Sequence, residues 1–461
     1  MTDATPTTPP PPVTFIEALK YWLKLGFISF GGPAGQISMM HQELVERRRW
    51  ISEQRFLHAL NYCMLLPGPE AQQLATYIGW LMHGVKGGIA AGVLFVLPSL
   101  FILVGLTWVY LAFGEVPAVA GILYGIKPAV VAIVVFAAYR IGSRALKNGV
   151  LLAIAAAAFV AIFAFDVPFP YIVLVAGLIG YFGSRVAPDK FQTGGGHGAT
   201  DKSFGPAIID DATPTPEHAK FKWSRLIMFA LVGFGLWSAI LAGLAVNYGW
   251  HGVLTQMGWF FTKAALVTFG GAYAVLPYVY QGGVEHYQWL TATQMIDGLA
   301  LGETTPGPLI MVVAFVGFVG GWTKALFGPD ALFLAGAAGA TVATIFTFLP
   351  SFLFILIGAP LVETTHGDLK FTAPLTGITA AVVGVILNLA VFFAYHVLWP
   401  QGLSQPLTFN TALVGFDWVS ALIGLAAFIA LFRFKAGIIQ VIGACAALGL
   451  IYALLRPLLL V

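Results

Sequence analysis

The four longest stretches of this chain without a charged residue are each long enough to cross a lipid bilayer. They lie between Lys86 and Glu115, between Arg225 and Lys263, between Asp330 and Glu363, and between Lys370 and Asp417. A transmembrane helix needs about 20 apolar residues, so several of these stretches have room for more than one element. Only 9% of the residues are charged, whereas soluble domains carry roughly 25%. The sequence therefore predicts an all-α integral membrane protein.

An internal repeat relates the two halves of the chain. A shift of 239 residues carries Phe30-Gly31-Gly32 onto Phe269-Gly270-Gly271, and Pro67-Gly68-Pro69 onto Pro306-Gly307-Pro308. Farther along, a shift of 252 residues carries Leu97-Pro98-Ser99 onto Leu349-Pro350-Ser351. The change of shift indicates an insertion in the second half between residues 320 and 340. A repeat of this kind predicts that both halves form the same structural unit.

The repeat and the composition divide the chain into four parts. Residues 1–13 have neither the basic nor the apolar segment of a signal peptide, and we expect a disordered tail there. Residues 14–185 form the first repeat domain, and the polar residues 186–224 form a cytoplasmic linker that we expect to be mobile. Residues 225–461 form the second domain, whose leading apolar helix at 225–248 has no counterpart in the first.

Basic residues are distributed unequally between equivalent loops of the two halves. Arg47, Arg48, Arg49 and Arg55 lie in one loop of the first half, and further basic residues cluster at 140–147 and in the linker. In contrast, residues 264–323 contain no Lys or Arg. Because basic loops stay in the cytoplasm, we predict that the halves are inverted-topology repeats.

The same charge rule bears on the four segments that carry the glycine and proline motifs. If each crossed the membrane fully, the basic loops at 47–55 and 140–147 would lie on opposite sides. Re-entrant hairpins at about 14–40, 55–84, 256–280 and 292–322 keep both loops cytoplasmic. This interpretation gives about nine full spans and four hairpins, about 13 hydrophobic segments in all. A discontinuous span with other loop placements satisfies the charge rule as well.

The repeated motifs are expected to break helices within the membrane. Consecutive glycines and prolines remove helix propensity and backbone donors, so one helix ends and another begins there. A new helix presents free N–H groups and the positive end of its dipole, which together bind anions. We therefore predict an anion site formed by the breaks and their polar neighbours. Its candidate residues are Lys24, Ser29, Gly31, Gly32, Gln36, Pro67, Gly68, Pro69, Gln73, Lys263, Thr268, Gly270, Gly271, Thr304, Thr305, Pro306, Gly307 and Pro308.

Charged residues near the breaks have more than one interpretation. Lys24 and Lys263 occupy equivalent positions and either attract an anion or extend toward the membrane surface. Lys127, alone in an apolar stretch, is a weaker candidate. Glu70 and Glu303 flank the Pro-Gly-Pro motifs, where each can carry a coupling proton or pair with a lysine. For Glu70, favourable placement in the first turn of a helix is an equal alternative.

The chain lacks the residue patterns that several classes of function require. The histidines show no metal-ligand spacing and no nucleotide-binding loop is present, so we expect no metal, no cofactor and transport powered by gradients. Cys63 and Cys445 stand in apolar surroundings and fit small core residues. No catalytic constellation is present, so we expect no enzyme, and we expect no nucleic-acid partner. The lipid bilayer is the expected environment, and a homodimer is a possible assembly.

The motif-bearing segments resemble the chromate transporter family, in its long type with two fused homologous domains. These segments are KLGFISFGGPAGQISMMHQELVERRRWISEQRF, LLPGPEAQQLATYIGW, FGGAYAVLPYV and ETTPGPLIMVVAFVGF. The resemblance implies a secondary transporter that exports chromate across the bacterial inner membrane. It makes Gly31, Gly32, Pro67, Gly68, Pro69 and Glu70 the functional core. The second half has Leu309 in place of Glu70, which implies that the halves differ in coupling. A broader sulfate or oxyanion carrier and an anion channel remain alternatives.

Overall fold

The structure is a computed structural model that describes residues 8, 10–191, 204–210, 213–214, 216–365, 372–402 and 415–459. Within these residues every regular element is a helix, apart from an isolated bridge between Ile51 and Ile209. Seven of the described helices are long and apolar enough to cross a membrane. The prediction of an all-α membrane protein is therefore confirmed.

The first half is a series of helices interrupted at the predicted breaks. Its elements are α1 (Phe15–Ile28), α2 (Gly32–His41), the π-helix η1 (Gln42–Arg47), α3 (Glu53–Leu65), α4 (Glu70–Phe113), α5 (Pro117–Ala145), α6 (Gly149–Phe165), α7 (Phe169–Val186) and the short α8 (Pro188–Phe191). The backbone of α4 leaves helical conformation at His83 and Gly84. This kink divides α4 into a short first part, which follows α3, and a long apolar second part.

The second half repeats this order after one additional helix. Its elements are α9 (Trp223–Tyr248), α10 (Val253–Leu266), α11 (Ala272–Tyr280), the π-helix η2 (Gln281–His286), α12 (Ala292–Thr304), the 3-10 helix η3 (Leu309–Met311), α13 (Val312–Thr323), the 3-10 helix η4 (Pro329–Ala331), α14 (Leu332–Thr365), α15 (Thr372–Leu398), α17 (Trp418–Phe432) and α18 (Ile438–Leu459). The stretch around η4 separates α13 from α14, where the first half has only the kink in α4. This is the region in which the sequence indicates an insertion.

All four predicted helix breaks are present. Helices end at Ile28, Leu65, Leu266 and Thr304, and the next helices begin at Gly32, Glu70, Ala272 and Leu309. At the Pro-Gly-Pro motifs the φ angles of Gly68 and Gly307 are 121° and 103°, a conformation that residues with a Cβ rarely adopt. Only glycine therefore fits these two positions of the breaks without backbone strain.

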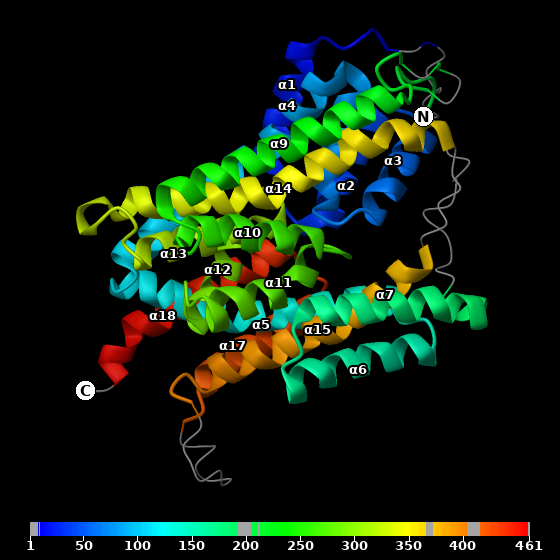
Figure 1. Ribbon diagram of the computed structural model, residues 1–461. Helices are drawn as coiled ribbons and strands as arrows, with labels where there is room; N and C mark the ends of the chain where they lie inside the picture. Colours follow the sequence, from blue (N-terminus) through cyan, green and yellow to red (C-terminus); the bar gives the residue numbers. More distant parts are fainter. Residues whose placement is uncertain are drawn as a thin grey trace.

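The side chains pack into two large hydrophobic cores. The smaller core joins α1, α2, α3 and the first part of α4 to the C-terminal part of α14. The larger core joins most of the second half to α5, α6 and α7 (Figure 1). Along α4, Phe95 belongs to the smaller core and Val96 to the larger one. Along α14, Phe348 belongs to the larger core and Ile355 to the smaller one. The two long helices thus pass from one core to the other near Pro98 and Pro350.

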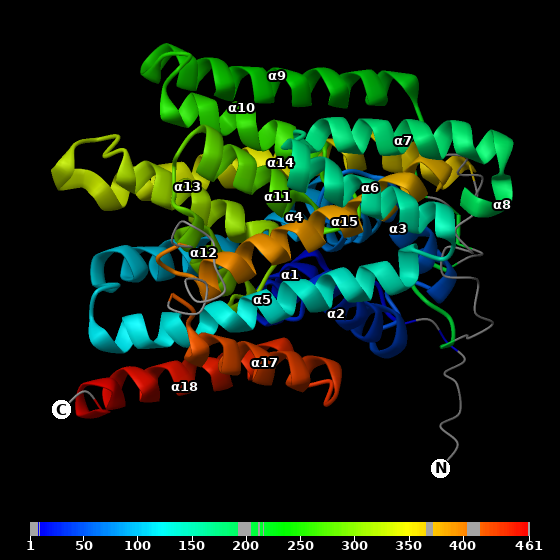
Figure 2. The same ribbon diagram turned by 90° about the horizontal axis from the view of Figure 1, so that it is seen from below.

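The outermost helices present apolar side chains to the surroundings. Figure 2 shows α9 at one edge of the molecule and α17 with α18 at the opposite edge. Leu231 and Phe234 of α9 and Leu422 and Leu425 of α17 are all exposed. Exposed apolar side chains on so many long helices are expected of a protein surrounded by lipid. The chain is a multi-pass membrane protein.

Part of the segment between the halves packs against the first half. The backbone N–H of Ile209 donates to the Trp50 carbonyl at 3.0 Å, and that of Ser52 donates to the Ile209 carbonyl at 2.9 Å. His218 contacts the Trp80 carbonyl through Nε2 at 2.8 Å. These residues of the predicted linker therefore contact the first half, and the mobility of the linker stays a prediction. Residues 192–203, 211–212 and 215 of the predicted linker, and residues 1–7 and 9 of the predicted tail, lie outside the described residues.

Candidate anion site

The four helix breaks meet in two reciprocal pairs. The backbone N–H of Gly68 donates to the Thr268 carbonyl at 2.7 Å, and the N–H of Gly307 donates to the Ser29 carbonyl at 2.9 Å. The 239-residue shift carries Gly68 onto Gly307 and Ser29 onto Thr268. Each Pro-Gly-Pro break therefore binds the Phe-Gly-Gly break of the other half. The two halves use equivalent atoms for this contact.

A narrow cavity lies where the breaks meet. It is lined by Pro33, Gln36, Pro69, Glu70, Ala71, Gly271, Ala272, Pro308, Leu309 and Ile310. Apart from Gln36, these residues stand at the start of α2, α4 and α11 and of η3, which leads into α13. Four helix N-termini therefore converge on one cavity. Each contributes free N–H groups and the positive end of a helix dipole.

Gln36 ties two of the breaks together from within α2. Its side chain is 1% exposed, and Nε2 donates to the Ser29 carbonyl at 3.1 Å and to the Gly307 carbonyl at 2.6 Å. The equivalent residue in the second half is Val275, so this contact exists on one side only. Gln36 Oε1 and Ser29 Oγ are buried without a hydrogen-bond partner.

Gln73 has a comparable position at the other pair of breaks. Its Nε2 donates to the Pro67 carbonyl at 2.8 Å and reaches Ser351 Oγ at 3.5 Å, while Oε1 is buried without a partner. The predicted threonines differ, because Thr268, Thr304 and Thr305 all donate their hydroxyls to carbonyls of the helix that ends at their break. The structure thus leaves Ser29, Gln36 and Gln73 with unused polar atoms at the breaks.

The two predicted coupling carboxylates have different surroundings. Glu70 lines the cavity at the start of α4, and no described side chain forms a hydrogen bond or an ion pair with it. Glu303 is 7% exposed and accepts a hydrogen bond from the Tyr273 hydroxyl. Arg140 of α5 acts electrostatically on both Glu303 and Tyr273. Only Glu70 therefore faces the cavity as an unpaired carboxyl group.

The two Phe-Gly-Gly breaks differ in accessibility. In α11 every residue from Ala272 to Val279 is buried, and this helix packs against α7 and α15. In α2 only Gln36 and Met40 are buried, and α2 packs against α4. The first break is therefore the more accessible of the two, although the motifs are equivalent in sequence.

Comparison with known proteins identifies the family. The family model described as Chromate transporter matches residues 16–181 and 255–450. The chain belongs to the chromate transporter family. It is 31% identical over 386 residues to the chromate transport protein of Cupriavidus metallidurans, covering 83% of this chain and 84% of the relative. It is 34% identical over 390 residues to the chromate transport protein of Pseudomonas aeruginosa, covering 84% and 82% respectively. No solved structure matches the chain.

More distant relatives are also described as transporters. An uncharacterized transporter of Methanocaldococcus jannaschii is 25% identical over 382 residues, covering 82% of this chain and 84% of the relative. As a member of the chromate transporter family, the chain is a transport protein and not an enzyme. The family match covers both repeats and leaves out the segment between residues 181 and 255.

The predicted lysines lie away from the cavity. Lys24 is exposed on α1, and Lys263 Nζ lies 5.8 Å from the ring centroid of Trp259. Neither lysine forms a hydrogen bond or an ion pair with a described break residue. Their role in anion binding stays a prediction.

Lys127 instead pairs with an acid that the sequence analysis did not single out. Its Nζ lies 3.5 Å from Asp297 Oδ2, and the Tyr110 hydroxyl donates to the same oxygen at 3.0 Å. Asp297 is 2% exposed. An acid alone in the apolar part of α12 is itself a signal of such a partner, because an unpaired buried charge is costly.

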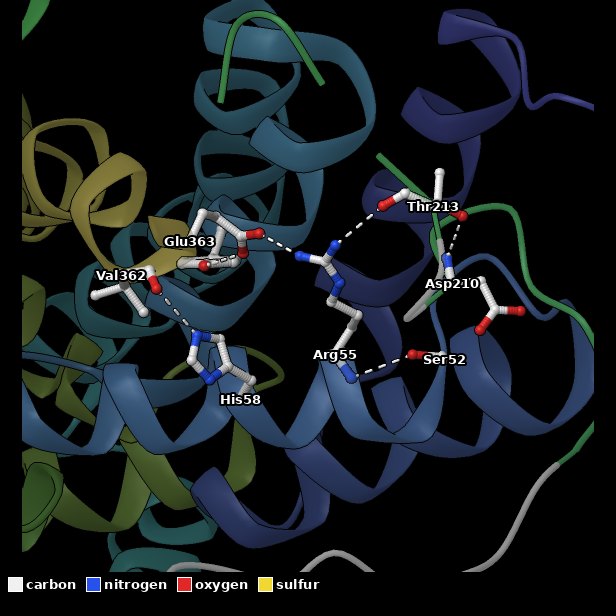
Figure 3. Close-up of polar contacts among 8 residues, drawn as sticks. Ser52, Arg55, His58, Asp210, Thr213, Val362 and Glu363 are labelled. Carbon is white, nitrogen blue, oxygen red and sulfur yellow. Dashed lines mark hydrogen bonds and ion pairs between the residues drawn. The ribbon is translucent and has the colours of Figure 1, made fainter. Parts of the chain in front are cut away.

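A second missed residue is Glu363, near the C-terminal end of α14. Arg55 of α3 forms an ion pair with it and also donates to the Thr213 carbonyl at 3.3 Å. The Tyr77 hydroxyl donates to the same carboxylate. Figure 3 shows Arg55 between Glu363 and Thr213, with His58 beside Val362. This network joins α3 and α4 both to α14 in the second half and to the segment between the halves.

The basic loop after α2 carries its own ion pair. Arg48 Nε donates to Glu43 Oε1 at 2.7 Å, and its guanidinium group also lies over the Trp50 ring, 5.2 Å from the centroid. The hydrogen bond from Arg48 holds the pKa of the Glu43 carboxyl group below its usual range. Glu43 therefore stays ionised and offsets part of the positive charge of this loop.

Proposed function

We propose that this chain exports chromate from the cytoplasm as a secondary transporter, by alternating access around the cavity between the four breaks. The observation that carries this proposal is the convergence of four helix N-termini on that one cavity, in two reciprocal pairs. The names of the relatives from C. metallidurans and P. aeruginosa support chromate as the substrate.

The chemistry of the cavity suits a dianion. Each helix N-terminus carries roughly half a positive elementary charge, and broken helices inside a membrane commonly direct these ends at anionic substrates. Ser29 adds an unpartnered hydroxyl group beside the same cavity, and this hydroxyl can donate to an oxyanion oxygen. The predicted site residues at the breaks remain the proposed ligands.

The membrane potential favours export. With the cytoplasm negative, each elementary charge is worth about 2.3 kcal/mol per 100 mV. A dianion that leaves therefore gains roughly 4 to 5 kcal/mol at that potential. Export needs no nucleotide hydrolysis under these conditions.

Glu70 links anion binding to protonation in this proposal. An ionised carboxylate and a dianion repel each other strongly when they share a small cavity of low dielectric constant. Glu70 lines the cavity and has no described partner to neutralise it. The dianion therefore binds most tightly when Glu70 is protonated. Leu309 stands at the equivalent position, so the second half contributes no such proton.

The proposed orientation is an inverted repeat in the bacterial inner membrane. The nine full spans correspond to the seven long apolar helices together with the shorter α6 and α17, and the four broken segments are re-entrant hairpins. The basic loop at 47–55 and the segment between the halves then face the cytoplasm. The loop formed by η2 faces outward.

Cysteine labelling tests this orientation. Single cysteines replacing Arg47, which is 65% exposed at its side chain, and His286, which is exposed in η2, should react from opposite sides of sealed vesicles. The background is a chain in which Cys63 and Cys445, both buried, are replaced by alanine. Labelling of both positions from one side would contradict the inverted repeat.

Chromate flux tests the function directly. In proteoliposomes that contain the full chain, radiolabelled chromate should accumulate on the side made positive, and acidifying the side that holds the chromate should raise its initial rate of transport. Glu70→Gln should transport with little dependence on pH, because the neutral amide imitates the protonated acid. Glu115→Gln, in an exposed turn after α4, is the matched control and should retain the wild-type pH profile.

Three results would contradict the proposal. The absence of chromate flux in the wild-type protein would reject a chromate carrier. If sulfate inhibits radiolabelled chromate flux as strongly as the same concentration of unlabelled chromate does, the protein is a general oxyanion carrier. Single-channel currents in planar bilayers would indicate a channel in place of alternating access.

A further inference from the structure

The repeated Leu-Pro-Ser motif places one serine at each Pro-Gly-Pro break. Ser99 and Ser351 follow Pro98 and Pro350 in α4 and α14 and are repeat equivalents. We propose that their hydroxyl groups are additional substrate ligands, which donate hydrogen bonds to the oxyanion from the two sides of the site. This inference rests on the proposed function.

The position of each serine is set by a glycine of the other repeat. A Cβ atom added at Gly307 would lie 2.7 Å from Ser99 Cβ and 3.2 Å from Ser99 Oγ. A Cβ atom added at Gly68 would lie 2.5 Å from Ser351 Oγ. Pro308 and Pro69, the residues after these glycines, line the cavity. Each serine therefore stands directly against the backbone that bounds the proposed anion site.

The two hydroxyls differ from the other buried hydroxyls of the same helices. In α4, Thr76 and Thr107 donate to the carbonyl four residues earlier, at 2.9 and 2.6 Å. In α14, Thr344 and Thr347 do the same at 2.8 and 2.7 Å. Ser99 Oγ, in contrast, has no hydrogen-bond partner although the residue is 0% exposed. Within the described residues, Ser351 Oγ has one contact, as acceptor from Gln73 at 3.5 Å.

Buried hydroxyl groups that donate no hydrogen bond are unusual, because buried polar groups are nearly always paired. A threonine-like bond to the preceding turn is the simplest way to satisfy such a group, and neither serine forms it. Both hydroxyl hydrogens therefore remain free to donate to a charged acceptor, which gives the stronger class of hydrogen bond.

The serines also complete the symmetry of the site. On one side the Ser29 carbonyl, the Gly307 N–H and Ser99 come together; on the other side the Thr268 carbonyl, the Gly68 N–H and Ser351 come together. Each group combines two segments of one repeat with one segment of the other. A tetrahedral oxyanion has acceptor oxygens on all sides, so donors on opposite sides of it can bind at the same time.

Alanine substitutions test these ligands. Ser99→Ala and Ser351→Ala should each raise the KM for chromate in proteoliposomes by about tenfold, because a hydrogen bond to a charged group is lost. The double variant should raise it further. The controls are Thr107→Ala and Thr347→Ala, which remove a hydroxyl from the same helices and should stay within about twofold of the wild type.

A binding measurement separates the outcomes. Sodium chromate should raise the unfolding temperature of the detergent-solubilised wild-type protein and of both controls, and it should do so less in each serine variant, whatever the unfolding temperature without chromate. Wild-type KM and wild-type stabilisation in both serine variants would overturn this inference alone. A wild-type protein that neither transports chromate nor is stabilised by it would overturn the proposed function and this inference together.

Discussion

Replacing Gly307 with alanine is expected to reduce chromate transport at least a hundredfold. The new Cβ atom would lie 2.7 Å from Ser99 Cβ, and the residue would hold a φ of 103°, which strains any residue with a side chain. Crowding and strain of this kind typically cost about 1–3 kcal/mol each. The break would move to relieve them, and the hydrogen bond from Gly307 to the Ser29 carbonyl would be lost. Gly68→Ala should act in the same way against Ser351.

Two other glycines separate the causes of this effect. Gly32 has a φ of 68° with nothing within 4 Å of an added Cβ, so Gly32→Ala tests backbone strain without crowding and should cost less activity than Gly307→Ala. Gly105 in α4 has neither a positive φ nor a close neighbour, and Gly105→Ala should transport normally. Initial rates of chromate flux, divided by the amount of folded protein, measure all four variants. Wild-type rates in both Gly68→Ala and Gly307→Ala would show that the reciprocal pairs do not form the transport site.

Replacing Arg55 with alanine is expected to destabilise the protein by about 3–5 kcal/mol. The side chain of Glu363 is 1% exposed, so removal of its ion-pair partner leaves a buried carboxylate with only the Tyr77 hydroxyl as a described donor. The same change removes the hydrogen bond to the Thr213 carbonyl. Because Arg55 joins α3 to α14, the loss should weaken the packing of these two helices within the smaller core. Denaturant unfolding in detergent measures the change in the free energy of unfolding.

A double-mutant cycle isolates the ion pair. Glu363→Gln removes the buried charge, so adding it to Arg55→Ala should restore part of the lost stability. Arg47→Ala removes a similar side chain whose partner, Glu43, lies 3.4 Å away at the surface, and it should change stability by about 0.5 kcal/mol or less. Equal effects of Arg55→Ala and Arg47→Ala would mean that the Arg55 pair contributes no more than a surface contact.

The positions of the helix breaks were predictable because they depend on local chemistry. Glycine and proline change the backbone at their own position, whatever surrounds them, so Phe30-Gly31-Gly32 and Pro67-Gly68-Pro69 marked the ends of helices without knowledge of the fold. The membrane class followed from composition, since long uncharged stretches have no other common explanation. The repeat then extended each statement from one half to the other.

The partners of these residues were not predictable, because they depend on how distant helices pack. Nothing local in the sequence shows that Gly68 binds the break at Thr268 instead of the one in its own half, or that Arg55 meets Glu363. Thr268 lay within the predicted site, but its hydroxyl donates to a carbonyl of α10. The hydroxyls of the equally repeated Ser99 and Ser351, in contrast, donate to no described residue. Lys24 matched Lys263 in sequence, yet the structure places both away from the cavity.

The sequence by itself determined where the helices break, that the chain resides in a membrane, and which family it resembles. Only the tertiary structure decided which breaks meet, which carboxyl group faces the cavity, and why α2 is accessible while α11 is buried. The physical reason is that glycine and proline act on the backbone locally. Pairing, burial and exposure, in contrast, are properties of contacts between residues far apart in the chain.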